Sequence, residues 1–275
     1  MNCMQRRAIL GGTFNPPHLG HLAVAAVALE RAGLQQVIWV PAGQPPHRTI
    51  DRLTKLPHRL EMLRLAIAPY PAFSLSTVEC DRASPSYAVH TLLKLQRQYP
   101  ASHWYWIIGL DAFQTLPRWY RRLELIPQCT WLVAPRPIHP SQVKSAQPGQ
   151  LTHPQPGQLT HNAQADPLNL ASRDLHNNLE GSDPTVVSTV STVSTQAVVY
   201  PPVLENSSRV CCQQVVQQLA SQQIEIQWQL LDMPPLNISS SLIRQQLGDR
   251  RSISTLVPAA VESYIRQHQL YEPLS

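Results

Sequence analysis

The stretch Gly11–His21 reads GGTFNPPHLGH and separates a short apolar run, Ala8–Leu10, from a segment of helical periodicity that begins at Leu19. An apolar run followed by a turn and an amphipathic segment predicts a strand that leads into a helix. The two glycines allow the backbone to approach a ligand closely, and the two prolines stiffen the turn. The sequence therefore predicts a ligand-binding turn at the carboxyl end of the first strand.

Two histidines, His18 and His21, lie three residues apart at the start of the expected helix. Helical spacing places them on one face, beside free N–H groups and a dipole that favour phosphate. Two imidazoles in this position can donate hydrogen bonds to a phosphate that gains charge in a transition state. A lone histidine at a helix start is more often a cap, but this framed pair favours function. The lysine of a P-loop and the GxGxxG fingerprint are both missing.

Strands and helices alternate along both folded parts of the chain, which predicts an α/β fold with a Rossmann-like, doubly wound parallel sheet. The expected strands after Ala8–Leu10 are Gln36–Ala42, Phe73–Cys80, His103–Asp111, Thr130–Arg136 and Glu225–Met233. The expected helices are Leu19–Gly33, Leu56–Pro69, Ser86–Tyr99, Leu116–Ile126, Cys211–Ala220, Ile238–Gly248 and Val257–Tyr271.

The composition changes near Pro137 and returns to a globular pattern near Arg209. The intervening segment contains the tandem octapeptides QPGQLTHP and QPGQLTHN and the run STVSTVST, with few aromatic residues. Such a segment cannot bury enough apolar surface to offset its ordering entropy. We therefore expect a single domain, formed by residues 1–136 and 207–275, with a disordered low-complexity insertion at 137–206.

The chain has 275 residues, of which 43% are hydrophobic and 14% charged, and a formal net charge of +5. An anionic partner is consistent with that charge, but the basic residues do not cluster with aromatics, so we expect no nucleic-acid partner. Five cysteines without a CxxC pair indicate neither a zinc site nor a disulfide framework. No apolar run is long enough for a signal peptide or a membrane span, so a cytoplasmic location without membrane attachment is expected.

The pattern GxFxPxHxGH resembles the signature of the nucleotidylyltransferase superfamily, whose short motif is HxGH. A second stretch, ISSSLIR at Ile238–Arg244, is similar to the distal ISSTxIR signature of that superfamily. Its serines, including Ser240, could cap a helix and bind phosphates, and Arg244 would face a polyphosphate from the first helical turn. A serine-rich cap alone means little, whereas its combination with HxGH is specific.

Three further stretches are similar to motifs of the nicotinate-nucleotide adenylyltransferase family. They are PAGQPPHR (Pro41–Arg48), SYAVHTLLKL (Ser86–Leu95) and IIGLDAFQTLPRW (Ile107–Trp119). The resemblance covers both folded parts and leaves out Pro137–Asn206. The sequence departs from the family pattern at four positions, namely Asn15 for Asp, Arg48 for Lys, Ala88 for Thr and His90 for Asp.

The resemblance implies adenylyl transfer from ATP to nicotinate mononucleotide, which gives deamido-NAD and pyrophosphate in NAD biosynthesis. The phosphate of the mononucleotide would attack the α-phosphorus in line, so that no protein nucleophile is needed and catalysis depends on positioning and charge stabilisation. The implied catalytic residues are His18, His21 and Arg244. Mg²⁺ is expected to bind mainly through the ATP phosphates, without metal ligands from the protein.

The resemblance also implies two sets of binding residues. The ATP-binding set is Gly11, Thr13, Phe14, His18, His21, Asp111, Ile238, Ser239, Ser241 and Arg244. The mononucleotide-binding set is Asn15, His47, Arg48, Tyr87, Trp119 and Arg136. Structural roles compete at three of these positions: Asp111 could be a helix N-cap, and Tyr87 and Trp119 could pack in the core.

Three other functions compete with this one. The first is an adenylyltransferase that prefers nicotinamide mononucleotide, and the second is a non-catalytic, nucleotide-binding regulator that recruits partners through the polar insertion. The intact His18, His21 and Arg244 argue against the regulator. A nucleic-acid-binding protein is the third and is disfavoured by the scattered basic residues.

Overall fold

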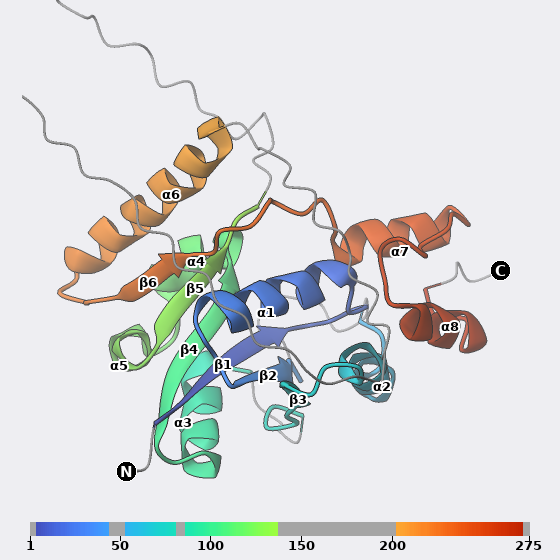
Figure 1. Cartoon of the computed structure of the whole chain (residues 1–275), viewed down its shortest axis with the longest axis horizontal. Coiled ribbons are helices and arrows are strands. Elements are labelled where there is room, and N and C mark those ends of the chain that lie inside the picture. The colour runs from blue at the N-terminus through green and yellow to red at the C-terminus, as the bar shows by residue number, and fades with distance from the viewer. Residues whose placement is uncertain (1–3, 44–52, 81–85, 137–201, 272–275) are drawn as a thin grey trace, which may run out of the picture. The chain divides into compact units, whose positions relative to one another are not determined.

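Six parallel strands form the sheet at the centre of the computed structural model, which describes residues 4–43, 53–80, 86–136 and 202–271 (Figure 1). Their spatial order is β3-β2-β1-β4-β5-β6, and every neighbouring pair is parallel. This arrangement confirms the doubly wound α/β prediction. The strands are β1 (Gln5–Gly12), β2 (Gln36–Pro41), β3 (Phe73–Leu75), β4 (Ser102–Gly109), β5 (Thr130–Ala134) and β6 (Gln227–Leu230).

Both faces of the sheet are buried, because successive residues of a strand point to opposite sides. In β1, Ala8 and Leu10 belong to one hydrophobic core and Ile9 belongs to the other. In β4, Ile107 faces the first core, and Trp106 faces the second. The apolar runs without polar alternation in β1, β2 and β5 follow from this double burial.

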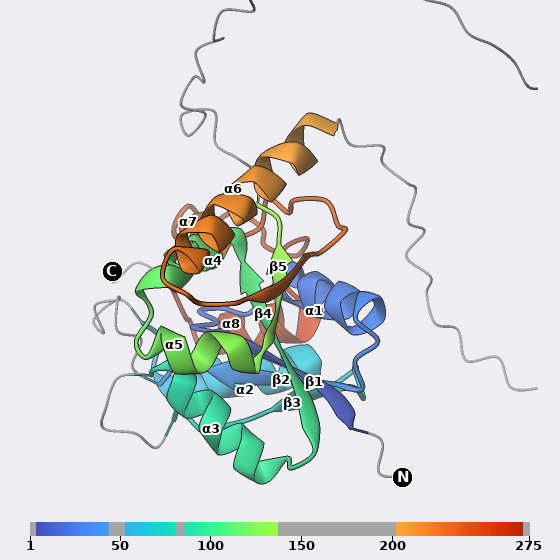
Figure 2. The ribbon, with the colours of Figure 1, turned by 90° about the vertical axis from the view of Figure 1, so that its left-hand side faces the viewer.

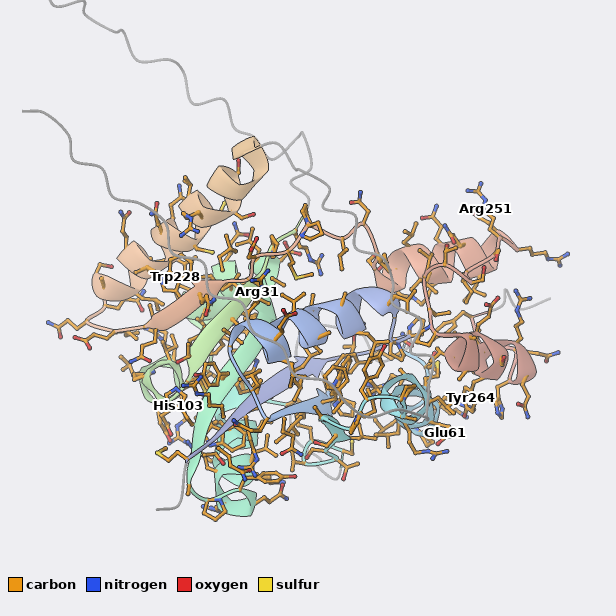
Figure 3. The ribbon with its side chains drawn as sticks, in the orientation of Figure 1. Arg31, Glu61, His103, Trp228, Arg251 and Tyr264 are labelled. Atoms are coloured by element: carbon orange, nitrogen blue, oxygen red, sulfur yellow. The ribbon has the colours of Figure 1, made fainter. Side chains whose placement is uncertain are left out.

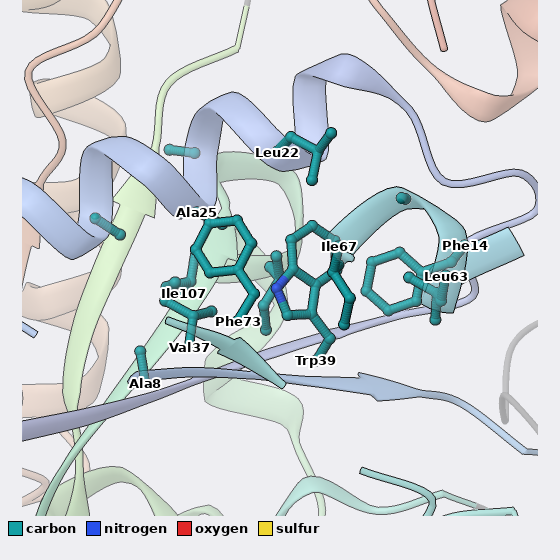
Figure 4. Close-up of a cluster of buried hydrophobic side chains, with 14 of the residues drawn as sticks. Ala8, Phe14, Leu22, Ala25, Val37, Trp39, Leu63, Ile67, Phe73 and Ile107 are labelled. Carbon is teal, nitrogen blue, oxygen red and sulfur yellow. The ribbon is translucent and has the colours of Figure 1, made fainter. Parts of the chain in front are cut away.

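The first core lies under four helices, of which α1 runs along the sheet next to β1 (Figure 1). Phe14, Leu22, Trp39 and Leu63 pack together between these helices and the strands (Figure 4). Gly33 follows α1 with a φ of +57°, a conformation that glycine adopts without strain, as the helix-stop signal predicts. The four helices are α1 (Leu19–Arg31), α2 (Leu56–Ile67), α7 (Ser240–Gly248) and α8 (Ala259–Gln267).

The second core lies under the helices on the opposite face of the sheet (Figure 2). The longer ones are α3 (Ala88–Gln98), α4 (Leu110–Thr115) and α6 (Pro202–Ala220). Between α4 and β5 the chain forms only short pieces, namely η2 (Leu116–Arg118), α5 (Arg122–Leu125) and η3 (Ile126–Gln128).

The expected continuous helix over Leu116–Ile126 is wrong. Arg121 has a left-handed φ of 51°, which a regular helix cannot include, and it separates η2 from α5. Pro117 lies in the first turn of η2, where a proline is tolerated, so it did not indicate that the helix would be interrupted at Arg121.

Several strand and insertion boundaries also differ from the sequence-based expectation. The third strand ends at Leu75, because the chain turns before Cys80, whose amide donates to the carbonyl of Thr77. The fourth ends at Gly109, so Asp111 lies in α4 rather than in a strand. Helix α6 begins at Pro202, inside the segment predicted as insertion, and residues 137–201 lie outside the described part of the chain.

The order of the strands creates a switch point between β1 and β4. From β1 the chain continues through α1 and α2 on one face, whereas α3, on the other face, leads to β4. The carboxyl ends of β1 and β4 therefore border a crevice, the usual ligand site of such sheets. Within the described ranges, no helix is long and apolar enough to cross a membrane.

Candidate active site

The turn after β1 is held in an unusual backbone conformation. Phe14 has a left-handed φ of 47° and is buried, with its ring over Gly12. A Cβ atom on Gly12 would lie 3.1 Å from that ring, so any larger residue would require the ring to shift. The peptide bond between Asn15 and Pro16 is cis. The turn ends at His18, which is the N-cap of α1.

His18 and His21 stack against each other at the amino terminus of α1. Their ring centroids lie 3.6 Å apart, with the planes inclined by 21°. The backbone amide of His21 donates to Nδ1 of His18 over 3.3 Å, and the amide of His18 donates to Nδ1 of His21 over the same distance. The two imidazoles thus replace the serine and glutamate of an ordinary capping box.

Burial keeps both imidazoles uncharged. It lowers the pKa of His18 to about 4, with a further lowering from the charge of Arg136. Burial, then the charges of His18 and Arg136, hold the pKa of His21 well below 6.5. Because each Nδ1 accepts a backbone hydrogen bond, the single proton of each neutral ring lies on Nε2. The pair therefore presents Nε2–H groups that can donate to an anion.

Gly20, between the histidines, allows the distal motif to approach them. A Cβ atom at this position would lie 3.0 Å from Nδ1 of His18 and 3.5 Å from Cβ of Ile238. The glycine of HxGH is thus required by close packing and not by its own φ.

The motif ISSSLIR lies against the β1–α1 turn, although about 220 residues separate the two segments. Ser239 caps α7 by accepting from the amide of Leu242 over 3.1 Å, as its position in the motif predicts. The Ser240 hydroxyl donates to the carbonyl of Pro16 over 2.8 Å. These bonds join the amino terminus of α7 to the turn that carries the histidines.

Arg244 spans the same two segments. One guanidinium nitrogen donates to the carbonyl of Asn15 over 2.8 Å, and another donates to Oγ of Ser241 over 3.1 Å. The motif predicted Arg244 in the first turn of the helix. Helix α7 starts at Ser240, so Arg244 instead begins its second turn.

Arg59 is a residue of this region that the sequence did not reveal. It is only 2% exposed, and its guanidinium donates to the carbonyls of Thr13, Ala42 and Thr54 over 3.0, 2.8 and 3.1 Å. Burial lowers the pKa of Arg59 from its usual value. Arg59 lies on the buried face of α2, three residues before Met62. A charged residue at a position where the helical pattern calls for an apolar one is the signal that could have identified it.

Asn15, expected to bind the mononucleotide, is 1% exposed and is held by protein groups. Its Oδ1 accepts from the Tyr271 hydroxyl over 2.7 Å and from the amide of Thr54 over 3.4 Å. Its carbonyl accepts from Arg244. Tyr271 is a second residue that the sequence analysis missed, because nothing in the C-terminal helix pattern distinguishes it.

A cavity of about 850 Å³ opens beside this turn, at the carboxyl ends of β1, β2 and β4. Three of the predicted site residues line it, namely Gly11, Tyr87 and Trp119. Its other lining residues are Gly12, Val40, Ala42, Glu79, Ser86, Ala88, Trp106, Ala112, Thr115, Arg118 and Tyr120. The predicted residues His47 and Arg48 lie outside the described ranges.

The aromatic residues of the cavity are fixed by their neighbours. Trp119 donates from Nε1 to Oγ1 of Thr115 over 2.9 Å, and its ring meets Trp106 edge to face. The rings of Tyr87 and Tyr120 lie 4.4 Å apart, at the start of α3 and after η2. Trp119 thus contacts the core and also lines the cavity, so the two roles weighed for it are compatible.

Among the described residues that line the cavity, two are charged. Glu79 is buried and accepts a hydrogen bond from the Thr91 hydroxyl. Arg118 is exposed, and its guanidinium makes no hydrogen bond or ion pair with any other residue that the structure describes. It is therefore available to an anionic ligand.

Asp111 and Arg136 form an ion pair of 2.8 Å between α4 and the end of β5, with both side chains exposed. Asp111 lies in the first turn of α4, and Gly109 is the N-cap, so the capping alternative for Asp111 is wrong. The charge of Arg136 bears on both histidines, which places it on the phosphate side of the site.

The donors of this site fit a metal that arrives with its ligand. Within the described ranges, no three His, Cys, Asp or Glu side chains form a group that could hold a metal ion. Polarised N–H groups, Arg244 and the adjacent aromatic cavity instead suit two ligands, one rich in phosphate and one with a flat ring.

Known proteins are similar to this chain in sequence and in fold. A family model described as cytidylyltransferase-like matches residues 9–246. A protein of Trichormus variabilis, named "Probable nicotinate-nucleotide adenylyltransferase", is 38% identical over 268 residues, covering 98% of each chain. The nicotinate-nucleotide adenylyltransferase of Bacillus subtilis is 41% identical over 134 residues, 49% of this chain and 71% of its own.

Solved structures agree at the level of the fold. The nicotinic acid mononucleotide adenylyltransferase of Plasmodium falciparum, complexed with NaAD, matches with a TM-score of 0.59 at 14% identity, covering 97% of each chain. Its complex with APC gives a TM-score of 0.58. Because the family model spans most of the sequence and a full-length relative is 38% identical, this chain belongs to the nicotinate-nucleotide adenylyltransferases of the cytidylyltransferase-like family.

Proposed function

We propose that this chain transfers the adenylyl group of ATP to nicotinate mononucleotide, giving deamido-NAD and pyrophosphate. The observation that carries the proposal is the juxtaposition of two sites at the end of β1. One is the donor group of His18, His21 and Arg244, and the other is the aromatic cavity that begins at Gly11.

The histidines would act as neutral hydrogen-bond donors to the triphosphate. Their Nε2–H groups are fixed in direction because both Nδ1 atoms accept backbone amides. As the mononucleotide phosphate attacks the α-phosphorus in line, charge grows on the α-phosphate oxygens and on the departing pyrophosphate. Donors already in place stabilise that charge without reorganisation. Arg244, with Ser239 and Ser241 at the start of α7, would hold the outer phosphates.

The remaining ATP contacts would come from the turn and the adjoining strands. Backbone groups of Gly11, Thr13 and Phe14 would approach the nucleotide, and Ile238 would border the adenine. Asp111 would accept from a ribose hydroxyl, for which its exposed carboxylate has acceptor sites beside the one that binds Arg136.

The cavity would hold the mononucleotide. Trp119 offers a ring face for the pyridine, and Tyr87 also lines the pocket. Arg118 would pair with the pyridine carboxylate, which nicotinate has and nicotinamide lacks. His47, Arg48 and Arg136 are proposed to meet the mononucleotide phosphate. Asn15 would contribute by shaping the turn, since its side chain is already bonded to the protein.

Mg²⁺ would accompany ATP, bound mainly through phosphate oxygens and water, and would offset part of the phosphate charge. Nucleotidyltransferases generally use a divalent metal ion that is bound through the phosphates of the nucleotide. The donor set described above fits such an ion, because it supplies N–H groups and leaves the oxygen ligands to ATP. A cytoplasmic location belongs to the same proposal, and the free thiols of Cys129, Cys211 and Cys212 are consistent with it.

The deciding experiment measures pyrophosphate release by the purified chain with ATP, Mg²⁺ and either mononucleotide. We expect kcat/KM for nicotinate mononucleotide to exceed that for the amide by at least about tenfold, on the strength of one charge-assisted contact. A reversed ratio would support the amide-preferring enzyme instead. Complete lack of pyrophosphate release with both substrates would support the non-catalytic regulator.

A further inference from the structure

The C-terminal end of the described chain contacts the phosphate side of the site. The hydroxyl of Tyr271 donates to Oδ1 of Asn15 over 2.7 Å, across 256 positions of sequence. Tyr271 follows α8, packs against the first core, and has a left-handed φ of 68°. A tyrosine rarely adopts this conformation, because it is strained, and the surrounding contacts must offset the strain.

Asn15 transmits this contact to Arg244. The same residue that accepts from Tyr271 through its side chain accepts from Arg244 through its carbonyl over 2.8 Å. Because Asn15 is buried, a change at its side chain shifts its peptide group rather than releasing it into solvent. The direction of the Arg244 guanidinium therefore depends on where Tyr271 holds Asn15.

Tyr271 is suited to be a permanent donor. Burial raises the pKa of its phenol to about 12, against the smaller lowering effects of a hydrogen bond to Thr54 and of the charges of Arg244 and Arg59. The hydroxyl thus keeps its proton throughout the physiological range, and the bond to Asn15 persists.

We propose that Tyr271 is a positioning residue of the transfer reaction: its hydroxyl fixes Asn15, and Asn15 fixes Arg244 toward the ATP phosphates. The inference rests on the proposed function in one respect, since it takes Arg244 as a ligand of the triphosphate. It adds the C-terminal end of the described chain to the machinery, although no sequence motif of the site includes that residue.

The test is Tyr271→Phe, which removes the hydroxyl and keeps the ring. We expect kcat to fall about tenfold and KM for ATP to rise, with KM for the mononucleotide within about twofold, because Arg244 lies on the phosphate side. The matched control is Tyr264→Phe on α8, which is labelled in Figure 3. Its hydroxyl bonds Nδ1 of His58 over 3.0 Å, so this variant also loses a contact between distant segments.

A merely structural role would make the two variants alike. Equal kcat values for Tyr271→Phe and Tyr264→Phe, at matched thermal stability, would overturn the inference. A double-mutant cycle adds a second criterion: if Tyr271 acts through Arg244, then Tyr271→Phe has no further effect on kcat in an Arg244→Ala background. A full tenfold loss in that background contradicts the proposed route.

Binding of ATP, measured by calorimetry without mononucleotide, separates this inference from the proposed function. Weaker ATP binding by Tyr271→Phe than by Tyr264→Phe supports the positioning role, even if the wild-type chain proves unable to transfer the adenylyl group. Equal binding and equal kcat refute the role while leaving the proposed reaction intact.

Discussion

The Nδ1 atoms of His18 and His21 each accept a hydrogen bond from the backbone amide of the other residue, at 3.3 Å in both directions. Protonation of either Nδ1 would set one N–H against another and remove a cap of α1. The geometry therefore works in the same direction as burial, which is the main cause of the lowered pKa values. The two imidazoles are therefore neutral because the fold buries them and directs backbone amides at both Nδ1 atoms.

The stability of the chain should fall with pH below about 6.5. The folded-state pKa of His18 is about 4 against 6.5 when unfolded, so the unfolded chain binds more protons between these values. The contribution to the free energy of unfolding is complete above pH 6.5 and is lost toward pH 4, by about 3 kcal/mol. Urea unfolding from pH 7 to pH 4.5 measures it.

The control for that titration is His18→Asn. The asparagine Oδ1 can accept the His21 amide as Nδ1 does, so the cap remains while the titrating ring is removed. Unfolding free energies of this variant should depend less on pH than those of the wild type. Identical pH profiles for the two proteins would show that His18 is not held neutral.

The same variant tests the catalytic role of His18. Because His18→Asn keeps the cap but lacks the Nε2–H donor, kcat should fall by about 10²–10³ with little change in stability. His18→Ala should lose a similar factor in kcat and, in addition, about 1 kcal/mol of stability with the cap. Pyrophosphate release and thermal unfolding measure both, and near-normal turnover in His18→Asn would remove the assigned role.

Local patterns explain why so much of the site region was predictable. The strand before Gly11, the helix after His18 and the cap at Ser239 depend on neighbours within a few residues, and the structure confirms each. The break at Arg121 was not predictable in this way. Arg121 adopts its left-handed backbone conformation because η2 and α5 both pack against the second core. Arginine itself has no preference for that conformation.

Contacts between distant segments were beyond the sequence. The carbonyls that bind Arg59 come from the turn after β1 and from both ends of the connection between β2 and α2, and the hydroxyl on Asn15 comes from the other end of the chain. In both cases the partners are far apart in the chain, and no regular spacing in the sequence indicates that they meet. The same limit applies to Arg118, which looked like one of many scattered basic residues until the structure placed it in the cavity.

Substitution of Arg59 should lower the free energy of unfolding more than substitution of any other residue near the active centre. Arg59→Met leaves three carbonyls without their donor in a buried place, for a loss of about 3–5 kcal/mol in the free energy of unfolding. Arg64→Met is the matched control on the same helix, because that side chain is 68% exposed and forms an ion pair with Glu61 at the surface. Its loss should be far smaller, because solvent screens an exposed ion pair. Denaturant unfolding of the two variants decides, and equal losses would contradict the bracing role of Arg59.

Arg118 should determine the preference for the acidic mononucleotide. Arg118→Gln removes a cavity cation that has no ion-pair partner among the described residues, so kcat/KM for nicotinate mononucleotide should fall about tenfold while the value for the amide changes little. Arg122→Gln is the control, since Arg122 binds Gln222 over 2.8 Å and does not line the cavity. Both substrates carry the phosphate, and only one carries the carboxylate. An equal loss on both would therefore assign Arg118 to the phosphate and contradict a role in selectivity, whereas a loss confined to nicotinate mononucleotide identifies the carboxylate as its partner.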